Sequence, residues 1–174
     1  MADNTDGAGL VRDITQNLNQ PMAGKRILLL GAGGAAEGVL HPILECEPRL
    51  VVIANRTLDK ALSMVKKVES SVVSLVACEF SSLQGQEFDI VINATSAGLT
   101  DSALPIPDTI FAKGCLAYDM MYGRETPFMA QAHHNGARVA DGLGMLVEQA
   151  AEAFYLWRNV RPATQPVIEM VRAL

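Results

Sequence analysis

The most restrictive feature of this sequence is an apolar run, Ile27 to Leu30, that ends abruptly in the glycine-rich segment Gly31–Gly34. The run predicts a buried strand, and the residues from Ala35 to Leu44 predict a helix. A strand, a glycine turn and a helix in this order are what a dinucleotide pyrophosphate requires, because its phosphates bind the free N–H groups at the positive end of the helix. Glycine clusters also mark ordinary turns, but the flanking strand and helix favour the phosphate-binding interpretation.

Each small residue of this turn has a predicted task. Gly31 allows the tight turn, and Gly33 lets the backbone approach the phosphates without a Cβ in the way. Ala36 keeps the helix close to the strand. The predicted cradle is completed by Ala32, Gly34 and Ala35.

Length and composition limit the class of protein. The 174 residues fit one domain, and 49% hydrophobic with 19% charged residues indicate a compact globular chain. The net charge of −5 argues against binding to nucleic acid or to an anionic membrane surface. The cysteines are odd in number and widely spaced, and the histidines are not arranged as ligands, so we expect no disulfide framework, no metal site and a cytoplasmic location without a signal peptide. The residues concerned are Cys46, Cys78, Cys115, His41, His133 and His134.

Short apolar runs alternate with helical patterns along the chain. Predicted strands cover 27–30, 50–54, 72–76, 88–92, 116–119 and 137–140. Predicted helices cover 8–18, 35–44, 58–68, 127–134, 142–158 and 165–174, with Asp6 or Thr5 capping the first, Pro42 kinking the second or shifting its end, and Asp141 capping the fifth. The fifth carries an apolar stripe that we expect to face the core, formed by Leu143, Val147, Ala150, Phe154 and Trp157.

This alternation predicts an α/β fold in which helices cover both faces of a parallel sheet. We expect one doubly wound, Rossmann-type domain over residues 1–174, with a first helix within about 1–20 and a terminal helix at 165–174.

The end of the second strand predicts which dinucleotide binds. An NAD-binding protein usually has Asp or Glu there for the ribose hydroxyls, whereas this chain has Asn55-Arg56-Thr57, with Lys60 one helical turn on. A carboxylate at this place would repel a 2′-phosphate, whereas a guanidinium can hold it through two hydrogen bonds. The sequence therefore favours NADP, although Lys60 could equally be a surface lysine.

Other polar residues follow the later strands. Thr95 and Ser96 could bind the cofactor, and a polar turn explains them equally well. Met120 could pack on a nicotinamide ring and Tyr122 could donate to a substrate carboxylate, with core packing as the default for both. Gln149 lies beside the apolar stripe and could reach a ligand.

Six segments, in this order, resemble shikimate dehydrogenase, and the resemblance covers essentially the whole chain. They are Asn4–Gly7, Gly31–Ala36, Asn55–Thr57, Asn93–Gly98, Tyr118–Tyr122 and Asp141–Met145. The resemblance implies reduction of 3-dehydroshikimate to shikimate with NADPH.

The resemblance also implies roles for matching positions. Gly31 to Ala36 would hold the pyrophosphate, and Met120 and Gly142 would line the nicotinamide. Asp6 would belong to the catalytic pair, as well as serving as a possible helix cap, and Tyr122 and Gln149 would touch shikimate. The 2′-phosphate would be held by Asn55, Arg56, Thr57 and Lys60.

The chain departs from that family at its N-terminus. Members carry a further N-terminal substrate domain, which the first and terminal helices would face and which supplies the catalytic lysine. We therefore expect a cofactor domain that is inactive alone and that self-associates through its terminal helices. A stand-alone NADP-binding regulatory or sensing module and the corresponding domain of a quinate-using relative remain alternatives. Asp6, Tyr122 and Gln149, which matter only for substrate, favour the enzyme.

Overall fold

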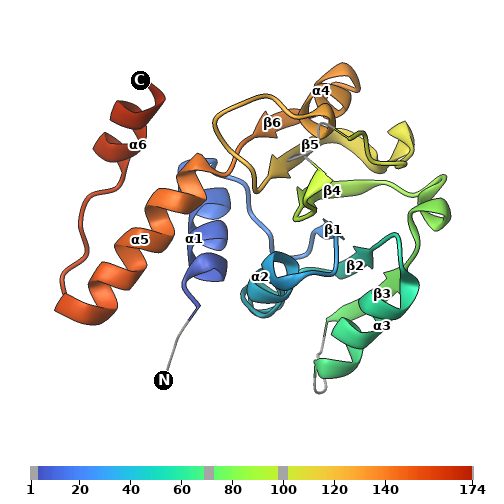
Figure 1. Cartoon of the computed structure of the whole chain (residues 1–174), viewed down its shortest axis with the longest axis horizontal. Helices are drawn as coiled ribbons and strands as arrows, with labels where there is room; N and C mark the ends of the chain where they lie inside the picture. Colours follow the sequence, from blue (N-terminus) through green and yellow to red (C-terminus); the bar gives the residue numbers. More distant parts are fainter. Residues whose placement is uncertain (1–3, 69–72, 98–101, 174) are drawn as a thin grey trace.

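A computed structural model describes residues 4–68, 73–97 and 102–173, and within them six strands form one parallel sheet (Figure 1). The strand order is β3-β2-β1-β4-β5-β6, so the chain reverses direction across the sheet between β1 and β4. This confirms the predicted doubly wound fold. The strands are β1 Arg26–Leu30, β2 Leu50–Ala54, β3 Ser74–Cys78, β4 Phe88–Asn93, β5 Phe111–Asp119 and β6 Arg138–Ala140.

Helices connect these strands and extend beyond them at both ends. The α-helices are α1 Asp6–Arg12, α2 Gly34–Glu45, α3 Leu58–Lys67, α4 Pro127–His134, α5 Leu143–Arg158 and α6 Gln165–Arg172. A π-helical turn, Asp13–Asn17, continues α1, and 3₁₀ turns cover Phe80–Leu83 and Asp108–Ile110. Figure 1 shows α5 beside α1, and α6 on the far side of α5 from the sheet.

Alternate residues of each central strand enter different cores. Ile27 and Leu29 of β1 pack with side chains from α1, α2, α3 and α5. Leu28 and Leu30 pack on the opposite face, with side chains from α4 and the two 3₁₀ turns. Burial on both faces explains why the inner strands are continuous apolar runs rather than alternating ones.

Several helices and strands begin or end at other residues than predicted. The first helix begins at Asp6 and changes to π-helical geometry at Asp13, instead of running as one α-helix over 8–18. The third strand lies two residues later than predicted, at Ser74–Cys78, and position 72 lies outside the described residues. The fifth strand begins at Phe111, not at 116. The second helix continues through Pro42 to Glu45.

The predicted core stripe of α5 is wrong in its second half. Leu143 is buried, but Phe154 is 45% exposed and Trp157 is 80% exposed. The buried face of the helix instead contains Gly144, Met145, Glu148 and Ala151. The last turns of α5 thus project apolar side chains away from the sheet.

Candidate cofactor cleft at the carboxyl edge of the sheet

The turn after β1 is shaped for close approach. The Gly31 N–H donates to the Ala54 carbonyl oxygen at 2.8 Å, and its φ is 105°. A Cβ at Gly31 would lie 3.1 Å from the Ala94 carbonyl oxygen and 3.2 Å from Thr95 Cγ2, so only glycine fits both the dihedral and the space.

The start of α2 leaves backbone donors available. Gly33 is extended and occupies the N-cap, and the first hydrogen bond of the helix runs from the Glu37 N–H to the Gly33 carbonyl oxygen at 2.9 Å. The N–H groups of the first turn of α2, from Gly34 to Ala36, therefore lack partners within the helix. An added Cβ at Gly33 or Gly34 would meet no described atom within 4 Å, so both face open space. Open space, free donors and the positive end of a helix together suit a phosphate.

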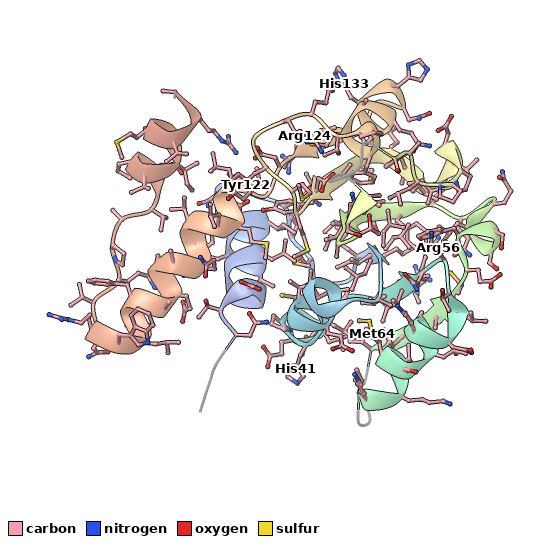
Figure 2. The ribbon with its side chains drawn as sticks, viewed as in Figure 1. His41, Arg56, Met64, Tyr122, Arg124 and His133 are labelled. Carbon is pink, nitrogen blue, oxygen red and sulfur yellow. The ribbon has the colours of Figure 1, made fainter. Side chains whose placement is uncertain are left out.

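The turn after β2 presents positive charge. Asn55 Nδ2 donates to the Thr57 carbonyl oxygen at 2.9 Å, which holds the turn closed before α3 begins. Arg56 and Lys60 are exposed, and no carboxylate among the described residues forms an ion pair with either. Figure 2 shows Arg56 at this turn, beside α3. Both cations are thus available to an anionic ligand.

The turn after β4 is held by its own side chains. Thr95 donates both its N–H, at 3.1 Å, and its hydroxyl, at 2.8 Å, to Asn93 Oδ1. The Thr95 Oγ1 in turn accepts from the Ala97 N–H at 3.3 Å. Asn93 is buried, so it fixes the turn from beneath while Thr95 and Ser96 line the surface.

These turns border one cleft of about 540 Å³. Because the strand order is β2-β1-β4-β5, the cleft runs from Arg56 past the glycine turn and Thr95 to Met120. The cations at one end and the open start of α2 beside them have the order in which an extended dinucleotide presents its phosphates. The lining residues are Gly31, Ala32, Gly33, Gly34, Ala35, Asn55, Arg56, Thr57, Lys60, Ala94, Thr95, Ser96, Met120 and Met121.

Two predicted cofactor residues lie behind this lining. Ala36 is buried against the sheet, in the packing position expected for it. Gly142 is buried beside the Met120 carbonyl, with which an added Cβ would collide, and its N–H donates to the Met121 carbonyl oxygen at 2.8 Å. Gly142 therefore sets the path of the backbone at the Met120 end of the cleft.

The predicted substrate residues lie outside the cleft lining. Asp6 is the first residue of α1, not its N-cap, and its N–H donates to Asn4 Oδ1 at 2.9 Å. The adjacent Thr5 donates its hydroxyl to Gln149 Oε1 at 3.2 Å, so the start of α1 and the middle of α5 meet. Tyr122 is 50% exposed, and Figure 2 shows it near the beginning of α5.

The start of α5 departs slightly from its predicted cap. Gly142 occupies the N-cap position, and Asp141 Oδ1 accepts from the Leu143 N–H at 3.4 Å from one residue earlier.

Buried polar contacts around Arg12 and the π-helical turn that follows it were not predicted. The Tyr118 hydroxyl donates to Asp13 Oδ2 at 2.7 Å, and Asn17 Nδ2 donates to Asp13 Oδ1 at 2.9 Å. Burial raises the pKa of Asp13 more than these hydrogen bonds lower it, and burial also raises the pKa of Tyr118. Arg12 Nε lies 3.1 Å from the buried Glu148 Oε2. An aspartate and a glutamate in amphipathic helices give no sequence signal of burial, which is why they were missed.

The described residues were also compared with the requirements of a metal site, a disulfide and a membrane-spanning helix. In the ranges 4–68, 73–97 and 102–173, no three His, Cys, Asp or Glu side chains gather as a metal site, and no helix has the length and apolar character needed to span a membrane. The cysteines at 46, 78 and 115 are free thiols. Burial raises the pKa of Cys115 to about 12, so that thiol stays protonated at neutral pH.

Comparison with known proteins identifies the family. Residues 13–100 match the family model described as shikimate / quinate 5-dehydrogenase, and residues 142–172 match that of the shikimate 5′-dehydrogenase C-terminal domain. A shikimate dehydrogenase (NADP(+)) of Methylobacillus flagellatus is 64% identical over 98% of this chain and 64% of its own length.

Solved structures agree with this match. The crystal structure of an Ael1 enzyme from Pseudomonas putida is 50% identical, with a TM-score of 0.93 over 97% of this chain and 62% of that one. A Thermus thermophilus shikimate 5-dehydrogenase, solved in complex with NADP(H) and shikimate, is 29% identical, with a TM-score of 0.80 over 98% of this chain and 62% of that one. This chain thus spans somewhat less than two thirds of the length of these relatives, and it belongs to the shikimate / quinate 5-dehydrogenase family.

Proposed function

We propose that this chain is the NADP-binding part of a shikimate dehydrogenase, which reduces 3-dehydroshikimate to shikimate. The observation that carries the proposal is the cleft itself, in which the glycine turn and the open start of α2 lie between the exposed Arg56 and Met120. The names of the relatives support the choice of cofactor and substrate.

Different residues of the cleft would bind different parts of the cofactor. Arg56 and Lys60, supported by Asn55 and Thr57, would bind the 2′-phosphate, and the start of α2 would bind the pyrophosphate. Met120 would contact the nicotinamide, which supplies the hydride when the cofactor is bound. Gly142 would keep Met120 in place from behind.

Three further residues are proposed to serve the substrate. Asp6 would act in proton transfer, and Tyr122 and Gln149 would bind shikimate. The Thr5–Gln149 hydrogen bond supports this grouping, because it joins the start of α1 to α5. The exposure of Tyr122 leaves its hydroxyl available to donate.

These 174 residues alone should bind NADP without catalysing turnover. Reduction of a ketone needs a proton donor for the developing alkoxide, and Lys60, the one lysine in the cleft lining, stands at the phosphate end. The test is to measure NADPH binding by calorimetry and then shikimate-dependent reduction of NADP by absorbance. Binding without turnover, and turnover after addition of the N-terminal part of a relative, is the expected result. Turnover by the purified chain would show that one of its own residues replaces the lysine.

Quinate is a second candidate substrate, because the matching family model names both compounds. Turnover with quinate but not shikimate in the reconstituted assay would favour it. NADP binding with turnover of neither compound would instead favour a regulatory or sensing module.

Self-association is proposed from the exposed apolar side chains at the end of the fold. The last turns of α5 expose Phe154 and Trp157, and α6 exposes Val167, Met170 and Val171. Contiguous apolar patches of this kind usually mark contact surfaces. A second copy of the chain is the proposed partner, through α6 and the last turns of α5, because no residue of α1 is exposed.

A further inference from the structure

A buried polar cluster lies beneath the Met120 end of the cleft, and none of the roles above uses it. It consists of Asn93 at the end of β4, Asp119 at the end of β5 and Thr126 before α4. Their side chains are 1%, 0% and 1% exposed, respectively. Asn93 and Asp119 face each other in the register of the two parallel strands. We refer to these three residues as the Asn93–Asp119 cluster.

Asp119 uses both carboxylate oxygens. Its Oδ2 accepts from Asn93 Nδ2 at 3.1 Å and from the Thr126 hydroxyl at 2.5 Å. Its Oδ1 accepts from the Met121 N–H at 3.0 Å. The carboxylate thus fixes the backbone that leaves β5 into the cleft.

Asn93 fixes both walls. Its Oδ1 holds the Thr95 N–H and hydroxyl, and its carbonyl oxygen accepts from the Met120 N–H at 3.0 Å. Each strand end therefore holds the first residues beyond β4 or β5, and the two wall segments 94–96 and 120–121 depend on one buried pair.

Packing alone does not explain a polar pair at this position. The adjacent strands β1 and β2 end at the same edge in Leu30 and Ala54, both fully buried and apolar. A buried carboxylate costs free energy unless every oxygen is hydrogen-bonded. The cluster meets that condition by recruiting donors from the walls of the cleft, which makes the position of the walls depend on it.

The order of strands indicates which part of the cofactor these walls face. With the 2′-phosphate at Arg56 beyond β2 and the pyrophosphate beyond β1, an extended dinucleotide continues over β4 and β5. We propose that the Asn93–Asp119 cluster positions the walls that bind the nicotinamide half of NADP, while the adenosine half is held independently of it. This inference rests on the proposed NADP binding.

The test compares NADP with adenosine 2′,5′-bisphosphate, which carries only the adenosine half. Asp119→Asn replaces one acceptor by a donor, so the donors from Asn93, Thr126 and Met121 can no longer all be satisfied. By calorimetry this variant should bind NADP about tenfold more weakly, while its affinity for the bisphosphate changes less than about twofold.

A double variant provides the matched control. Asn93→Asp with Asp119→Asn exchanges amide and carboxylate and keeps an acceptor for Thr95 and another for Met121. The Thr126 hydroxyl, which can rotate, would accept from the new amide instead of donating, so NADP affinity should recover. The inference would be overturned if Asp119→Asn lost affinity for NADP and for the bisphosphate equally, or lost affinity for neither. It would also be overturned if the double variant did not recover NADP affinity.

A measurement on the wild type keeps the test decisive if the single variant does not fold. The amides of Thr95 and Met121 should exchange their hydrogens slowly before any cofactor is added, because their acceptors are buried. Rapid exchange at either amide refutes the positioning role. If the wild type bound neither NADP nor the bisphosphate, the proposed function would be refuted instead. The hydrogen-exchange measurement would still test whether the cluster positions the two walls.

Discussion

Arg56 offers the sharpest prediction about cofactor choice. It is exposed at the edge of the cleft and pairs with no carboxylate in the described ranges, so its removal should leave the fold intact. Each hydrogen bond to a charged group contributes about 1.5–3 kcal/mol. Loss of one such bond to the 2′-phosphate corresponds to a decrease in NADP affinity of about 10-fold to 150-fold in Arg56→Ala. NAD lacks that phosphate, so its affinity should stay within about twofold.

Calorimetric titration of NADP and NAD into the wild type, Arg56→Ala and a control variant checks this expectation. The matched control is Arg49→Ala, because Arg49 is an exposed arginine just before β2, at the opposite edge of the sheet, and its loss changes the net charge equally. A parallel weakening of both cofactors in Arg56→Ala, or an equal effect of Arg49→Ala, would refute a specific 2′-phosphate contact. Equal wild-type affinities for the two cofactors would refute the preference for NADP itself.

Three other perturbations test separate parts of the structure. Gly142→Ala should lower the free energy of unfolding by about 1–3 kcal/mol in a denaturant titration and weaken NADP binding, because the new methyl group meets the Met120 carbonyl. Unchanged NADP affinity would show that Gly142 does not shape the cleft. Burial raises the pKa of Asp13 above its usual 3.8, so its contribution to stability is present below that pH and is lost as the pH rises through the folded-state value. Asp13→Asn should therefore lose less unfolding free energy than wild type between pH 3.8 and neutrality, and identical pH profiles would contradict this. Sedimentation should show concentration-dependent association of the wild type that the double variant Val167→Asp, Val171→Asp abolishes, whereas a wild type that stays monomeric at high concentration would exclude the exposed face of α6 as a contact.

The sequence predicts the central sheet well because burial on both faces leaves an unbroken apolar signal. β2 begins and ends where predicted, and β1 differs by one residue. The first half of β5 was missed because Lys113 and Gly114 interrupt its apolar pattern. The face of α5 was misassigned because its apolar residues surround the helix, while Glu148 is buried by partners from distant segments.

The same limit applies to the candidate site. The turn residues Arg56 and Thr95 could be placed because parallel strands bring their carboxyl ends to one edge. Asn93 and Asp119 could not, since a polar residue at a strand end gives the same pattern whether it is exposed or buried. Their burial depends on the pairing of β4 with β5, which is a property of the folded chain.

Glu148 has a consequence for how the chain loses its structure. Its Oε1 accepts from Asn17 Nδ2 at 3.1 Å and from the Thr164 hydroxyl at 2.6 Å, and Arg12 pairs with its Oε2. Segments near opposite ends of the sequence are thereby joined through one side chain outside the sheet. Segments that share buried contacts tend to open together. We therefore expect α1 and the segment leading into α6 to unfold in one cooperative step, in which loosening either segment releases the other.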